Sequence, residues 1–183
     1  GRDVRESSPA LVEALALGLN QGGASVLDLG LCGTEEVYFA AFQPRVDGGI
    51  MVTASHNPID YNGMKLVRGG AIPISGDSGL RALESAVSTS SALPSGRAVL
   101  EPVSYRPAYV QHLLGYVDAA SLGRLRIVVN AGNGGAGLVV DALAPHLPFD
   151  FMRLQHEPDG RFPNGIPNPL LPENRVATAQ AGQ

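Results

Sequence analysis

The sequence contains few of the residues that mark specialised classes of protein. Of its 183 residues one is cysteine, none is tryptophan, and aromatic residues make up 5%. The single cysteine, Cys32, excludes an intrachain disulfide framework and is typical of a small buried hydrophobic residue in a reducing compartment. No apolar run is long enough to cross a membrane, and no segment resembles a secretory signal. We therefore expect a cytoplasmic protein without a membrane partner.

Charged residues are also scarce. They make up 16% of the chain, the net charge is -4, and the pI is about 5.5. Binding to nucleic acid or to an anionic membrane surface needs a basic patch, which this balance does not favour. The hydrophobic content of 44% suits one or two globular α/β domains with a buried core. We expect no nucleic-acid partner. The composition does not distinguish a monomer from an oligomer.

Helical and strand patterns alternate along the first half of the chain. The expected helices begin at Ser7-Ser8-Pro9 and at Thr34, and a third runs through Leu80, Leu83 and Val87; the expected strands are 26–29, 50–52 and 64–67. Such β-α-β alternation predicts an α/β fold with a mixed or mostly parallel sheet covered by helices.

The second half repeats this alternation after a segment rich in Ser and Pro, residues 88–102, which we predict to be a linker. We expect a helix through Tyr109 and Leu113, strands at 125–129 and 149–154, a helix at about 138–147 and a long loop at 155–172. The sequence thus predicts two domains, residues 1–100 and 101–183.

The most informative stretch is GIMVTASHNPIDYNGMKLV, residues 49–67. A short apolar strand, 50–52, leads into a polar turn that contains Ser55, and a second strand follows that carries Lys65. Strands at both ends hold a loop rigid, as a reactive side chain requires. From spacing alone, adjacent Ser55 and His56 are more typical of an ordinary solvated turn than of a functional site.

The string T-A-S-H-N-P followed by Y-N-G-M-K-L-V resembles the phosphoserine loop of the α-D-phosphohexomutases, the family of phosphoglucomutase, phosphomannomutase and phosphoglucosamine mutase. Two further segments resemble the family, G-R-D-V-R at 1–5 and D-G-R-F-P-N with P-N-P at 159–169. The finer likeness is to bacterial phosphomannomutases of the GDP-mannose pathway. The resemblance implies the family's first domain, incomplete, and the start of a similar second domain.

The resemblance also implies a chemistry. Ser55 would carry a phosphoryl group and interconvert mannose 6-phosphate and mannose 1-phosphate through a hexose 1,6-bisphosphate, with Mg²⁺ bound to the phosphoserine. Lys65 would act as a proton shuttle or cationic stabiliser. The remaining implied roles are a hydrogen bond to the phosphoserine for His56, orientation of the loop for Asn57, and shaping or charging of the phosphate region for Arg2 and Arg5.

The resemblance further implies that functional parts of the family lie outside this sequence. These are the N-terminal strand, the aspartate-rich loop that holds the metal, and the sugar- and phosphate-recognition segments of two later domains. We therefore expect the chain to be a partial enzyme that is inactive alone. Its first sheet would have a free edge and exposed apolar area.

The segment Gly132–Gly137 satisfies the dinucleotide-binding pattern G-x-G-x-x-G after a strand and before a helix. The pattern also requires an acidic residue at the end of the next strand, where this chain has Arg153 and Gln155. We therefore interpret the segment as a tight strand-to-helix turn. The alternative function is a non-catalytic α/β module that binds a nucleotide at this turn.

Overall fold

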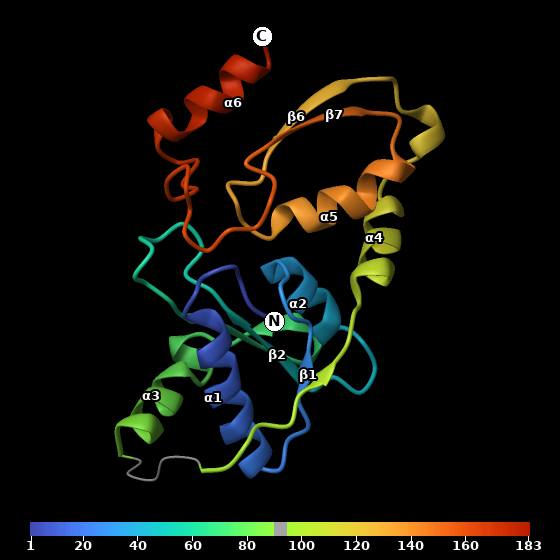
Figure 1. Ribbon diagram of the computed structural model, residues 1–183. Coiled ribbons are helices and arrows are strands. Elements are labelled where there is room, and N and C mark those ends of the chain that lie inside the picture. Colours follow the sequence, from blue (N-terminus) through green and yellow to red (C-terminus); the bar gives the residue numbers. More distant parts are fainter. Residues whose placement is uncertain (90–94) are drawn as a thin grey trace.

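The computed structural model describes residues 1–89 and 95–183 and contains two α/β units (Figure 1). The first unit comprises α1 (Ser8–Gln21), β1 (Leu27–Asp28), α2 (Thr34–Ala41), β2 (Gly48–Val52), β3 (Met64–Arg68), β4 (Ile72–Pro73) and α3 (Leu80–Thr89). The later elements are β5 (Glu101–Pro102), α4 (Arg106–Leu114), β6 (Arg126–Asn130), α5 (Ala136–Leu143), β7 (Asp150–Leu154) and α6 (Val176–Ala181). Short 3₁₀ turns occupy 69–71, 76–78, 119–121, 144–146 and 172–175.

The sheet of the first unit combines a parallel part with an antiparallel part. Strand β1 pairs in parallel with β5, whereas β2, β3 and β4 pair antiparallel in that order. Arg2 joins the two parts, because it forms parallel bridges to both Leu31 and Val52. The α/β class with a mixed sheet is therefore confirmed, and the first three residues of the chain lie between β1 and β2.

Helix α2 covers the sheet with the main apolar cluster of the first unit. Cys32, Val37 and Met51 are buried together and Leu29 packs against them. The amide of Gly33 donates to the Glu36 carboxylate at 2.9 Å, which satisfies one of the free N–H groups at the start of α2. In Figure 1, α1 and α3 lie together on the side of the sheet away from the second unit.

Helix α3 turns its apolar stripe toward solvent. Leu80, Leu83 and Val87 are 43%, 46% and 75% exposed. A helix with this amphipathic pattern ordinarily buries such a stripe against a neighbouring element. Within the described residues the first unit thus leaves a row of apolar side chains uncovered.

The predicted linker, residues 88–102, is only partly a linker. Residues 90–94 lie outside the described residues, and residues 88 and 89 end α3. Residues 101 and 102 form β5, and the amides of Glu101 and Val103 donate to the carbonyls of Val26 and Asp28, both at 2.9 Å. The prediction is wrong for this last part, because an extended segment beside an open sheet edge gains hydrogen bonds. The domain boundary after residue 100 stays a prediction.

The second unit is built on a parallel pair of strands, as its β-α-β pattern predicts. β6 and β7 pair over five residues, from Arg126 opposite Asp150 to Asn130 opposite Leu154. Helix α5 forms the crossover between them and α4 packs against α5. In the part of the chain that the structure describes, no helix combines the length and the apolar character needed to cross a bilayer.

Cys32 gives a direct test of the core. It is 3% exposed, and burial raises the pKa of its thiol to about 11 from an ordinary value near 9.0. Because the thiolate is the reactive form, we expect iodoacetamide at about pH 8 to alkylate the native protein roughly a hundredfold more slowly than the denatured protein. The rate is measured by mass spectrometry with time. Equal rates in the two states would contradict a buried Cys32.

Candidate active site

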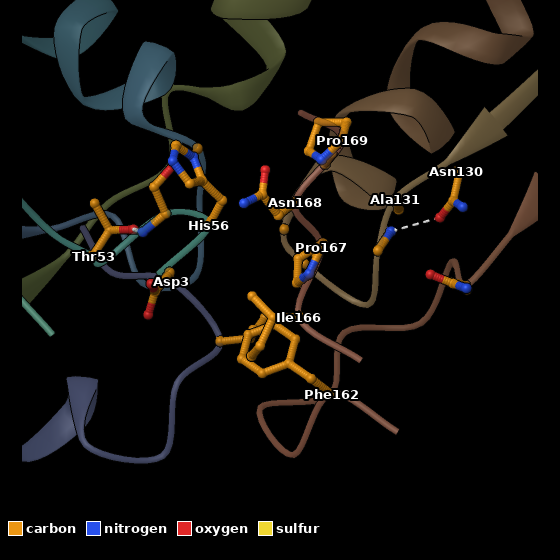
Figure 2. A pocket seen from close by; sticks show the side chains of 18 of the residues that line it. Asp3, Thr53, His56, Asn130, Ala131, Phe162, Ile166, Pro167, Asn168 and Pro169 are labelled. Atoms are coloured by element: carbon orange, nitrogen blue, oxygen red, sulfur yellow. Dashed lines mark hydrogen bonds between the residues drawn. The ribbon is translucent and has the colours of Figure 1, made fainter. Parts of the chain in front are cut away.

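A cleft of about 1090 Å³ lies between the two units and receives residues from both. Figure 2 shows Asp3, Thr53 and His56 of the first unit on one side and Asn130 and Asn168 of the second unit on the other. The wall of the first unit also includes Ser55. The wall of the second unit is rich in small and amide-bearing residues, and it also contains Ile166, Pro167 and Pro169. The small and amide-bearing residues are Asn130, Ala131, Gly132, Gly134, Gly135, Ala136, Gln155, Asn164, Gly165, Asn168, Asn174 and Ala179.

Ser55 begins the turn that follows β2 and is exposed at the cleft. Its φ of +53° places it in the left-handed region, which residues with a side chain seldom adopt. The amide of Ser55 donates to Oγ1 of Thr53 at 2.9 Å, which helps to stabilise this conformation. A strained, exposed serine at the end of a buried strand is a typical arrangement for a reacting hydroxyl.

Arg5 holds the loop that contains Ser55. The side chain is 1% exposed, and its terminal nitrogens donate to four loop carbonyls, those of Ser55 at 3.1 Å, Asn57 at 2.7 Å, Pro58 at 2.6 Å and Tyr61 at 3.0 Å. A guanidinium has five N–H groups, and these bonds use four of them. The fifth, on Nε, lies 3.2 Å from the Asp3 carboxylate. This Nε–H forms an ion pair with Asp3 but no hydrogen bond, and it is buried. None of the five N–H groups of Arg5 is therefore exposed to a phosphate.

Asp3 completes this arrangement, although the sequence analysis did not single it out. One carboxylate oxygen accepts from the Ser8 hydroxyl at 2.6 Å and from the Arg5 amide at 3.0 Å. The other accepts from the amide of Ala54 at 3.4 Å. Asp3 belongs to the G-R-D-V-R segment, so its position was visible in the sequence. Its partners were not, because they come together only when residues 1–5 pack beside the end of β2.

The other predicted site residues are distributed around the loop. His56 is exposed and lines the cleft, whereas Asn57 uses its side-chain amide to donate to the Ala54 carbonyl at 2.9 Å. Lys65 is exposed on β3 directly opposite Met51, which lines the cleft, so both side chains leave the sheet on the same face. Arg2 lies apart, 3.9 Å from the Asp28 carboxylate.

The glycine-rich turn of the second unit is packed against the protein itself. Gly132 has a φ of +56°, and a Cβ at this position would overlap the side chain of Pro167. A Cβ at Gly137 would lie 2.6 Å from the carbonyl oxygen of His156. Close approach within the chain thus accounts for both glycines. This favours the interpretation of the segment as a tight strand-to-helix turn.

Asn133, at the centre of that turn, organises the loop that follows β7. It is 7% exposed, its Nδ2 donates to the Glu157 carbonyl at 2.9 Å, and its backbone carbonyl accepts from the Asp159 amide at 2.9 Å. Its Oδ1 accepts from Nδ2 of Asn164, also at 2.9 Å. The turn therefore fixes the loop 157–164 against the wall of the cleft.

The described residues do not contain a ligand set for the Mg²⁺ that the resemblance implies. No group of three or more His, Cys, Asp or Glu residues in the ranges 1–89 and 95–183 could hold a metal ion. The carboxylate of Asp3, which accepts from the amide of Ala54 next to Ser55, also accepts from Ser8 and Arg5. A divalent ion needs several free oxygen ligands, and a phosphate on Ser55 would supply only part of them.

Comparison with known proteins identifies the family. Residues 1–93 match the model of phosphoglucomutase/phosphomannomutase α/β/α domain I, and residues 107–183 match the model of domain II of the same family. The chain therefore belongs to the phosphoglucomutase/phosphomannomutase family, and the resemblance of its motifs is confirmed.

Relatives and a solved structure agree with this assignment. The chain is 61% identical over 182 residues to the phosphohexose mutases of Xanthomonas campestris pv. campestris and 53% identical over 189 residues to a phosphomannomutase of Salmonella typhimurium. A crystal structure of a phosphoglucomutase/phosphomannomutase family protein from Burkholderia thailandensis superposes with a TM-score of 0.83 at 38% identity, covering 98% of this chain and 40% of that one. The chain spans 41% of the length of the two curated relatives, which cover 99% of it.

The loop geometry predicts a large difference between two arginines of one motif. Arg5→Lys keeps the positive charge but cannot reach four carbonyls, so we expect it to lower the free energy of unfolding by about 2–4 kcal/mol. Arg2→Lys alters a partly exposed ion pair and should cost less than about 1 kcal/mol. Urea denaturation of both variants measures the difference. Equal losses would show that Arg5 does not support the loop.

Proposed function

We propose that this chain is the part of a phosphohexomutase that carries the phosphoryl group, with Ser55 as the carrier. The observation that carries the proposal is the exposed, left-handed Ser55 at the cleft, on a loop that a buried guanidinium holds. Membership of the phosphoglucomutase/phosphomannomutase family supports it. Because the chain spans 41% of its relatives, we expect it to be inactive alone, and turnover would belong to the complete protein.

In the proposed reaction the phosphoryl group moves from Oγ of Ser55 to a free hydroxyl of a hexose monophosphate. The P–O bond to Ser55 breaks, the P–O bond to the sugar forms, and the proton of the sugar hydroxyl passes to a base and finally to Oγ. The resulting 1,6-bisphosphate reorients and returns its other phosphoryl group to Ser55. Such transfers depend chiefly on in-line positioning and on neutralisation of the charge on the transferring oxygens.

The residues around Ser55 support particular roles. Arg5 shapes the loop, because its four terminal N–H groups donate to loop carbonyls and its charge is paired with Asp3. His56 reaches the cleft and would donate to a phosphate on Ser55, while Asn57 stabilises the turn. Lys65 is not among the residues that line the cleft, but it leaves β3 on the same face as Met51, which does, and it would act as a cationic stabiliser or proton shuttle. Arg2 contributes to the sheet rather than to this group.

Mannose phosphates are the proposed substrates. The Salmonella typhimurium relative is named a phosphomannomutase, and the motifs of this chain resemble that subfamily. The side-chain amides of four cleft residues, Asn130, Asn164, Asn168 and Asn174, already make hydrogen bonds within the chain. A side-chain amide has two N–H groups and two acceptor lone pairs, so the remaining capacity of these amides would be used for sugar hydroxyls. Mg²⁺ remains the proposed metal and would need ligands from outside the described residues. A nucleotide-binding module remains the alternative, and binding of NAD or ATP by the isolated chain would favour it.

Labelling of Ser55 tests the proposed carrier. We expect the protein, as its source cells produce it, to incorporate one phosphate from a radiolabelled hexose 1,6-bisphosphate, and Ser55→Ala to abolish both incorporation and mutase turnover. The matched control is Ser75→Ala, an exposed serine bonded to Ser78 outside the cleft, which should label normally. Full labelling of the Ser55→Ala variant would refute the proposed carrier.

A substitution of Lys65 tests its proposed role in the reaction. Lys65→Met removes the charge and keeps the length of the side chain, so we expect kcat to fall by about a hundredfold, since a positioned acid–base group contributes about 10²–10⁴. Because Lys65 is exposed, the melting temperature should change little. Steady-state kinetics and calorimetry measure the two effects. An unchanged kcat would exclude Lys65 from the reaction.

A further inference from the structure

Phe162 adopts a conformation that a bulky residue rarely tolerates. Its φ is +48°, it is 7% exposed, and its amide donates to the Asp159 carbonyl at 3.0 Å within a tight turn. A left-handed aromatic residue is an outlier that persists only where the surroundings fix it. The contacts of the Phe162 ring therefore indicate what holds this conformation.

The ring contacts Arg5 of the first unit. The guanidinium carbon lies 5.4 Å from the ring centroid, and Arg5 is itself 1% exposed. Since the four terminal N–H groups at the edge of the guanidinium bind the loop carbonyls, and Nε faces Asp3, the face of the group is the part that remains for a ring. A cation held over an aromatic face is attracted to it, and more strongly where water is excluded.

The backbone beside Phe162 is seated just as closely on the first unit. A Cβ at Gly160 would overlap the carbonyl oxygen of Val4 and would lie 3.3 Å from the amide nitrogen of Glu6. Residues 159–162 thus lie directly on the backbone on both sides of Arg5. The two ends of this turn are held within the second unit by Asn133, which accepts from the amide of Asp159 and from the side chain of Asn164.

We infer that Phe162 is a positioning residue for the Ser55 loop and that it acts through Arg5. The ring covers the guanidinium, keeps water from its face and restricts it to the conformation that reaches all four carbonyls. Phe162, a side chain of the second unit, therefore helps to fix the conformation of the Ser55 loop in the first unit. The consequence for turnover rests on the proposed function, whereas the effect on the loop does not.

The test is hydrogen–deuterium exchange of peptides that cover residues 54–63, in the protein as its source cells produce it. Phe162→Leu keeps an apolar side chain but removes the ring, and we expect the loop amides to exchange about tenfold faster. Phe162→Tyr keeps the ring and should restore slow exchange. The matched control is Phe151→Leu, which removes another ring that faces an arginine, Arg153 at 5.9 Å, and should leave the loop unchanged.

Gly160→Ala gives a second route to the same result, because its methyl group must displace the segment from Val4. This variant replaces Phe162→Leu as the test if Phe162→Leu also raises exchange in β6 and β7, because such a rise would indicate unfolding of the second unit. Unchanged loop exchange in Phe162→Leu and Gly160→Ala would overturn the inference. So would faster loop exchange in Phe151→Leu, or the absence of restoration in Phe162→Tyr.

Activity separates this inference from the proposed function. If Ser55 carries the phosphoryl group, Phe162→Leu should lower kcat about tenfold with little change in KM, and Phe162→Tyr should restore it. If Ser55→Ala still incorporates phosphate, the proposed function fails while the exchange result stands. If exchange is unaffected and Ser55→Ala is inert, the positioning role of Phe162 fails and the proposed function stands.

Discussion

The buried guanidinium of Arg5 is the constraint on which the site depends. Four backbone carbonyls of one loop converge on it, and Asp3 balances its charge from the other side. Burying a charge is costly unless it is paired and hydrogen-bonded, so this group favours a single loop conformation over the alternatives. The strained backbone of Ser55 is one consequence. A loop with this composition and no such anchor would sample many shapes.

The two walls of the cleft are joined at separate points by different interactions. Phe162 packs on Arg5 near the Ser55 loop. At the start of α4, Arg106 donates to the buried Glu36 carboxylate at 2.9 Å and to the Leu31 carbonyl at 2.8 Å. Because Glu36 also caps α2, the ion pair ties the second unit to an element of the first core. The glycine-rich turn belongs to this framework, since its Asn133 holds the loop that bears Phe162.

Much of the fold follows from patterns of neighbouring residues in the sequence. The apolar run of β2, the turn residues after it and the return in β3 predict a strand–loop–strand, and the structure has β2 and β3 paired antiparallel around Ser55. The strand β5 at the end of the predicted linker was not predicted, because it forms by pairing with the open edge of β1 and its own two residues carry no strand pattern. The partners of Arg5 were also hidden, since local periodicity carries no information about contacts between distant segments.

The sequence by itself determined the α/β class, the family and the position of the candidate serine, because strand and turn propensities and short motifs depend on neighbouring residues. Only the tertiary structure decided what the two arginines of one motif do. Arg5 is enclosed by the Ser55 loop and by Phe162, whereas Arg2 lies beside Asp28 in the sheet. The physical reason is burial: a guanidinium takes its role from the acceptors that surround it, and those acceptors are assembled only when segments distant in sequence pack together.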